Sequence, residues 1–220
     1  MQRLLKGDLR QTVSTTGYSD RINHAFAFAA KHHDSQVRKG TALPYLTRPP
    51  NVAVILTRYG QPEDTVLAGI LHSVVEGSVR DGFTRDELDD RIGAKFGGHV
   101  LETALAVAER RSDDAGVEMS PEERKADAVA RLAAASEAAR WVCAADALHS
   151  ASTIVADLKR TEYPENVWAR TYRGREGTMR WYRLVYDRLV EVGFTAPIMD
   201  ELSDTVEALE RRGAAVVGQL

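Results

Sequence analysis

The chain has 220 residues, of which 44% are hydrophobic and 28% are charged, with a formal net charge of −3 and one cysteine, Cys143. A chain of this length can bury a sizeable core, and its slight acidity argues against nucleic acid as a partner, since nucleic-acid binders usually carry a strong basic surplus. A single cysteine excludes an internal disulfide and suits a reducing compartment. No apolar stretch approaches the roughly 20 residues of a membrane span, and residues 1–20 contain no signal-peptide core. We therefore expect a cytoplasmic protein without a membrane partner.

The N-terminal part of the chain predicts an arm, a helix and a proline-rich loop. Residues 1–18 are polar and irregular, which predicts a loose arm. Ser19 is a suitable N-cap for a helix in which apolar residues recur at helical spacing up to His33. Glycine and prolines in residues 38–51 predict a loop, and a helix is expected from about Val52 until Gly60 ends it.

The rest of the chain predicts further helices and no strands. Residues 67–75, in a helix opened by Asp64, are apolar nearly all round, so this helix should lie in the middle of the domain. Thr84 and Ser120 are each followed by a glutamate three residues later, which is the capping box of a helix start. Because no β-alternation appears, we predict one compact, multi-helix, all-α domain over residues 19–220. The remaining predicted helices span 99–109, 136–158, 175–192 and 197–212, and "TEYPEN" is expected to be a connector.

Three polar residues interrupt apolar helical faces. His33 continues the face of Ile22 and Phe26, His72 lies within "AGILHSVV", and Asp146 lies within "WVCAADALHSA". A buried carboxylate is costly unless it is paired, hydrogen-bonded or bound to a metal. Two histidines and a carboxylate form a set that suits a divalent transition metal, provided that the three helices bring them together.

Ordinary structural roles are open for the same residues. A lone histidine on an apolar face is more often hydrogen-bonded to the backbone than bound to a metal. Asp146 can also serve as a polar contact between helices, with His149 one turn later as its partner. The spacing alone does not decide between a metal site and a polar core.

The order of three segments resembles a known family. They are "AFAFAAKHHDSQVRKGTALPYLTRPPNVAVIL", "GQPEDTVLAGILHSVVEGS" and "AADALHSASTIVADL", and "VWARTYRGREGTMRWYR" is similar to a tail of stand-alone members. Together they resemble the HD superfamily of metal-dependent phosphohydrolases, and more narrowly the hydrolase domain of RelA/SpoT homologues and the small alarmone hydrolases. The resemblance spans roughly residues 20 to 210.

This resemblance implies an activity and a set of site residues. The family removes the 3′-pyrophosphate of guanosine tetra- or pentaphosphate, usually with manganese or another divalent cation. It implies that His33, His72 and Asp146 are metal ligands and that Glu76, one turn beyond His72, positions or activates the attacking water. The residues that it places near the nucleotide are Arg38, Lys39, Tyr45, Arg48 and Ser150.

Several residues at the implied site depart from the family pattern. Ser73 stands where the family has the aspartate of its His–Asp pair, Gly77 replaces the second acid of the Glu–Asp pair, and Arg48 replaces a histidine. A neutral hydroxyl is a poor substitute for a carboxylate on a hard cation. Two hypotheses follow: a metal-dependent phosphohydrolase with weakened or altered activity, or an inactive domain that binds a nucleotide or a protein partner. An oligomer is compatible with either hypothesis.

Overall fold

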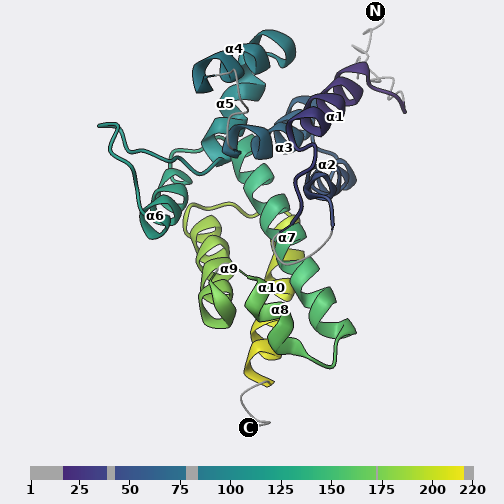
Figure 1. The fold of residues 1–220 in the computed structure, drawn as a ribbon, viewed down its shortest axis with the longest axis vertical. Helices are drawn as coiled ribbons and strands as arrows, with labels where there is room; N and C mark the ends of the chain where they lie inside the picture. The colour runs from purple at the N-terminus through teal and green to yellow at the C-terminus, as the bar shows by residue number, and fades with distance from the viewer. Residues whose placement is uncertain (1–16, 39–42, 78–83, 172, 216–220) are drawn as a thin grey trace, which may run out of the picture.

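The computed structural model describes residues 17–38, 43–77, 84–171 and 173–215 (Figure 1). Most of the predicted N-terminal arm lies outside these residues. The described residues form α-helices, one short 3-10 helix and two isolated β-bridges but no strand, so the all-α prediction is confirmed. The elements are α1 Asp20–His32, η1 Tyr45–Thr47, α2 Arg48–Arg58, α3 Glu63–Glu76, α4 Arg85–Phe96, α5 Gly98–Val107, α6 Pro121–Arg131, α7 Glu137–Arg160, α8 Pro164–Arg170, α9 Gly174–Glu191 and α10 Ile198–Ala215.

The predicted helix starts are confirmed by their hydrogen bonds. The Ser19 hydroxyl accepts from the backbone N–H of Ile22 at 3.2 Å, which satisfies one free donor of α1. Capping boxes begin α4 at Thr84 and α6 at Ser120, and in both the glutamate three residues later accepts from the cap N–H, at 2.8 and 2.7 Å. Local hydrogen bonding therefore sets these starts independently of tertiary contacts.

Two predicted boundaries are wrong. Helix α2 begins at Arg48 rather than at about Val52, because Pro49 and Pro50 lie in its first turn, where a missing N–H breaks no helical hydrogen bond. The predicted connector "TEYPEN" runs into α8, which Pro164 opens in the same way. The first correction matters for function, since it fixes Arg48 at the start of a helix.

Helix α3 forms the centre of the fold. Residues 65–75 are all buried, and α3 packs against α1, α2, α5 and α7. At Gly69 a Cβ atom would lie 2.5 Å from Leu56 Cδ1 and 3.3 Å from Val52 Cγ1, so a larger residue there would require the Leu56 side chain to move. The prediction that residues 67–75 are buried in the centre is confirmed.

Helix α7 is the second central element, and Figure 1 shows it running along the long axis of the molecule. It packs against α2, α3 and α5 and also against α8, α9 and α10. Trp141 and Leu148 lie in the core, as predicted from the apolar stretch between them. None of the described helices is both long and apolar enough to cross a membrane.

Candidate functional site

The central helices surround a cavity with a volume of about 640 Å³. Helix α3 presents His72 and, one turn later, Glu76 to this cavity, and α7 presents Asp146. Arg48 reaches it from the first turn of α2, and the opposite wall comes from α6, α8 and α9. The cavity is therefore lined by segments that lie far apart in the sequence.

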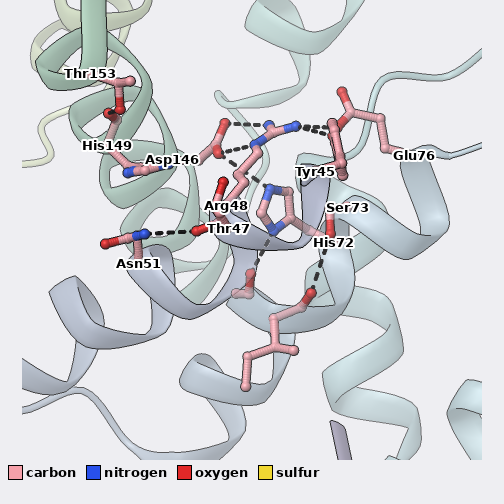
Figure 2. Close-up of polar contacts among 12 residues, drawn as sticks. Tyr45, Thr47, Arg48, Asn51, His72, Ser73, Glu76, Asp146, His149 and Thr153 are labelled. Carbon is pink, nitrogen blue, oxygen red and sulfur yellow. Dashed lines mark hydrogen bonds and ion pairs between the residues drawn. The ribbon is translucent and has the colours of Figure 1, made fainter. Parts of the chain in front are cut away.

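Arg48 joins the acidic side chains of the cavity (Figure 2). Its Nε donates to Asp146 Oδ1 at 2.6 Å and its Nη2 donates to Asp146 Oδ2 at 2.7 Å, which is the bidentate geometry of the strongest ion pairs. Its Nη1 donates to the Tyr45 hydroxyl at 2.7 Å and to Glu76 Oε2 at 3.2 Å. A single guanidinium thus connects η1, α3 and α7.

This pairing keeps Asp146 ionised. Burial acts to raise the pKa of the carboxyl, but the positive charge of Arg48, the nearby His72 and the hydrogen bonds from Arg48 hold that pKa well below its usual range. Since the side chains of Arg48 and Asp146 are only 21% and 20% exposed, solvent screens the pair weakly.

His72 lies beside this ion pair. Its Nδ1 is 2.7 Å from the carbonyl oxygen of Gly69, and because a carbonyl only accepts, Nδ1 must carry the proton. Its Nε2 points to Asp146 Oδ1 at 3.5 Å, longer than an ordinary N–H···O hydrogen bond. His72 and Asp146 therefore lie next to each other at the cavity, as predicted.

His33 does not complete the predicted metal set. Its Nδ1 lies 3.0 Å from Gln36 Oε1 and its Nε2 lies 3.0 Å from the Ser73 hydroxyl, and both His33 and Ser73 are buried outside the cavity lining. Successive residues of a helix point about 100° apart, so His72 faces the cavity while Ser73 faces α1. The prediction that His33 shares an ion site with His72 and Asp146, with Ser73 at its edge, is not supported by this geometry.

The side chains present do not fit a divalent cation. Among the described residues, no three histidine, cysteine, aspartate or glutamate side chains come close enough to hold a metal ion. Both oxygens of Asp146 are bound to Arg48, and a guanidinium has no lone pair with which to bind a metal. The side chain that joins His72 and Asp146 at the cavity is therefore Arg48 rather than His33.

The structure brings most of the other predicted residues together. Lys39 lies outside the described residues. Ser150, on α7, and Tyr182, on α9, both line the cavity. The predicted catalytic and substrate residues that line the cavity are Arg38, Tyr45, Arg48, Glu76 and Ser150.

The wall formed by α6 and α9 was not predicted from the sequence. Lys125 of α6 lies with its Nζ 4.3 Å from the centre of the Trp181 ring and pairs with Glu109. Burial lowers the pKa of Lys125. The sequence carries no signal for this role, because "EERKADAVAR" reads as an ordinary surface helix. Cys143 also lines the cavity, but burial raises the pKa of its thiol to about 12, so it stays a neutral thiol.

The HD domain family model matches residues 25–178. This chain belongs to the HD domain family. The match contains α2, α3 and α7, which supply Arg48, His72, Glu76 and Asp146 to the cavity.

Known proteins similar to this HD domain come from bacteria and animals. It is 33% identical over 92 residues to guanosine-3′,5′-bis(diphosphate) 3′-pyrophosphohydrolase of Aquifex aeolicus and 32% identical over 108 residues to a GTP pyrophosphokinase of Myxococcus xanthus. These matches cover 41% and 49% of this chain but only 13% of either relative.

Two solved structures share the fold. A crystal structure from Listeria monocytogenes has a TM-score of 0.60 at 26% identity, over 77% of this chain and 99% of that chain. A metazoan orthologue of SpoT that hydrolyses ppGpp has a TM-score of 0.63 at 22% identity, over 88% of this chain and 97% of that one. At these identities the helical architecture is the shared property.

Gly77 ends α3 of this HD domain beside α1. A Cβ atom at this position would lie 2.9 Å from His32 Nε2 and 3.3 Å from the carbonyl oxygen of Ser73. An acidic side chain here, as in the family pattern that the sequence resembles, would require His32 to move. Glycine at position 77, in place of the family's acid, therefore fits the space that His32 leaves beside α3.

The buried histidines predict that acid destabilises this HD domain. Burial lowers the pKa of His33 and His149 below the usual 6.5. The two histidines bind protons near pH 6.5 in the unfolded chain but only at lower pH in the folded chain. The contribution of the neutral histidines to the free energy of unfolding is therefore complete above about pH 6.5 and is lost as the pH falls. We expect a lower thermal unfolding midpoint at about pH 5.5 than at about pH 7.5.

Two variants separate this effect from general acid sensitivity. His33→Gln should reduce the difference between the two midpoints, because it removes one of the buried titrating groups. His99→Gln, at an exposed position of α5, should leave that difference unchanged. An equal midpoint at both pH values in the unmodified protein would contradict the prediction.

Proposed function

We propose that the central cavity binds a phosphorylated guanosine nucleotide of the class named for the relatives of this chain. The observation that carries the proposal is a cavity of about 640 Å³ that combines aromatic surfaces with several cations. Nucleotide-sized ligands occupy cavities of about 300–1,000 Å³ that are largely apolar and contain a few polar groups. The names of the relatives suggest the guanosine class.

Aromatic side chains on two sides of the cavity suit a nucleobase. Tyr45 of η1 lines the cavity, and so do Trp181 and Tyr182 of α9. Stacking of a base on an aromatic ring is worth about 1–3 kcal/mol. Lys125 already lies over the Trp181 ring, so a base stacked there would also approach a cation.

The charged lining favours a ligand with several phosphates. Six cations line the cavity against four acids, Glu76, Glu109, Asp146 and Asp157. Since four acids can offset only four of the six cations, the lining keeps a surplus of two positive charges. The resulting surplus attracts anions into a partly enclosed space. The six cations are Arg38, Arg48, Arg124, Lys125, Arg170 and Arg173.

Hydrolysis of this nucleotide is the second candidate function. It is favoured by His72, Glu76 and Asp146, which face one cavity, and by a relative named as a 3′-pyrophosphohydrolase. Manganese or another divalent cation would supply Lewis acidity in such a reaction. We rank nucleotide binding above hydrolysis as the candidate function, because the Asp146 carboxylate is already bound to the Arg48 guanidinium.

Calorimetric titration with guanosine tetraphosphate tests the proposal. We expect one binding site per chain in buffer that contains EDTA, and binding at least tenfold weaker for guanosine, which lacks the phosphates. The same samples with added Mn²⁺ should release no pyrophosphate. Absence of binding under both conditions would reject the proposal, and release of pyrophosphate with Mn²⁺ would establish the second candidate.

A further inference from the structure

We infer that the Arg48 guanidinium takes the place of a divalent cation in this site, so that the site excludes metal and works without it. HD superfamily hydrolases are generally metal-dependent, and this chain departs from them at the group that faces Asp146. The inference deepens the proposed function and rests on it only where the nucleotide is concerned. The exclusion of metal rests on the side chains alone.

The first support is the convergence of acceptors on one cation. Two oxygens of Asp146, one of Glu76 and the hydroxyl of Tyr45 all lie within 3.2 Å of guanidinium nitrogens. Figure 2 shows the guanidinium between the carboxylates of α3 and α7. Oxygen ligands from separate helices commonly converge on a bound cation in this way, and here the cation is part of the chain.

The second support is charge. Two carboxylates carry two negative charges, and Arg48 neutralises one of them. A divalent ion bound to Asp146 would lie beside the guanidinium, and the two cations would repel each other more strongly in this partly buried site than in water. Arginine is not deprotonated in proteins, so a change of pH does not remove this repulsion.

The third support is that the neighbouring side chains have other partners. His33 and Ser73 are paired with each other at 3.0 Å, and Gln36 occupies the second nitrogen of His33. A carboxylate at position 73 would have to replace the Ser73–His33 hydrogen bond before it could approach Asp146. Residue 48, which already contacts Asp146, is therefore the position to change in a test of metal binding.

The Arg48–Asp146 pair differs in its location from an ion pair that only stabilises the fold. The Arg48–Asp146 pair lines the cavity and is one-fifth exposed, so a dissolved cation can reach it. Competition between guanidinium and metal is therefore a measurable property, and charge at position 48 is the variable to change.

The test is a titration of the protein with Mn²⁺ in the absence of nucleotide. The electron paramagnetic resonance signal of the free ion measures how much Mn²⁺ is unbound. Arg48→Gln keeps an amide donor for Asp146 but removes the charge, and we expect it to gain roughly tenfold or more in Mn²⁺ affinity. Arg48→Lys keeps the charge and should resemble the unmodified protein. Arg211→Gln, at an exposed arginine of α10, is the control for the loss of a surface charge.

Three results would overturn the inference. They are Mn²⁺ binding by the unmodified protein as tight as by Arg48→Gln, an equal gain by Arg48→Lys, and absence of Mn²⁺ binding by folded Arg48→Gln. Thermal unfolding shows which variants are folded, and tight Mn²⁺ binding by the unmodified protein would overturn the inference even without variants. Failure of guanosine tetraphosphate to bind both in EDTA and with Mn²⁺ rejects the proposed function and leaves the Mn²⁺ titration to decide this inference.

Discussion

Replacing Arg48 with alanine should lower the free energy of unfolding by about 3 kcal/mol, because it leaves Asp146 buried without its counter-charge. The Asp146 carboxylate would lose both bidentate hydrogen bonds at once. Glu76 and the Tyr45 hydroxyl would lose the same donor. Urea unfolding of the purified variant measures the loss.

A double-mutant cycle assigns this loss to the pair. Asp146→Ala alone should also destabilise the protein, and adding Arg48→Ala to it should cost less than Arg48→Ala costs by itself. Arg183 and Glu210 make a similar bidentate pair on α9 and α10, with side chains 33% and 38% exposed. Because that pair is more exposed, Arg183→Ala should cost less than about 1 kcal/mol. Equal losses for Arg48→Ala and Arg183→Ala would contradict the interpretation.

Reversing the charge of Lys125 should weaken the binding of guanosine tetraphosphate about 100-fold. A charge-assisted hydrogen bond contributes about 1.5–3 kcal/mol, and every 1.4 kcal/mol is tenfold in affinity. Lys125→Glu removes that cation and places a second acid next to Glu109, which would repel the phosphates. Calorimetric titration in EDTA measures the change.

The matched control is a lysine that lies away from the cavity. Lys95 is exposed on α4, where its Nζ lies 5.7 Å from the centre of the Phe96 ring. Lys95→Glu makes the same change in net charge and should leave the affinity within about twofold of its original value. Equal weakening by both variants would show that net charge, and not the cavity, governs binding.

The local structure of this chain could largely be predicted from its sequence. The capping residues Ser19, Thr84 and Ser120 begin helices where predicted, because their hydrogen bonds involve only residues three positions away. The apolar run at 67–75 predicted a buried central helix, because a helix that is apolar all round has no face for water. The errors at Pro49 and Pro164 arose because proline opens a helix as readily as it interrupts one.

The composition of the candidate site was decided by the tertiary structure. His33, His72 and Asp146 had equivalent sequence signals, each a polar residue on an apolar face, but α1 directs His33 to Ser73 while α3 and α7 direct the other two to the cavity. The sequence marked Arg48 only as a departure from a family pattern. Its contact with Asp146 spans 98 positions of the chain.

The sequence by itself determined the all-α class, the helix starts and the central place of α3, because periodicity and capping act over a few residues. Only the tertiary structure decided that a guanidinium completes the cluster of Glu76 and Asp146, and that Lys125 lies over the Trp181 ring in the cavity wall. Such pairs depend on the packing of α2, α3, α6, α7 and α9, and small differences in helix position redirect a side chain from the cavity to the core. Close packing, as at Gly69 between α2 and α3, fixes these directions, and it involves residues that are distant in the sequence.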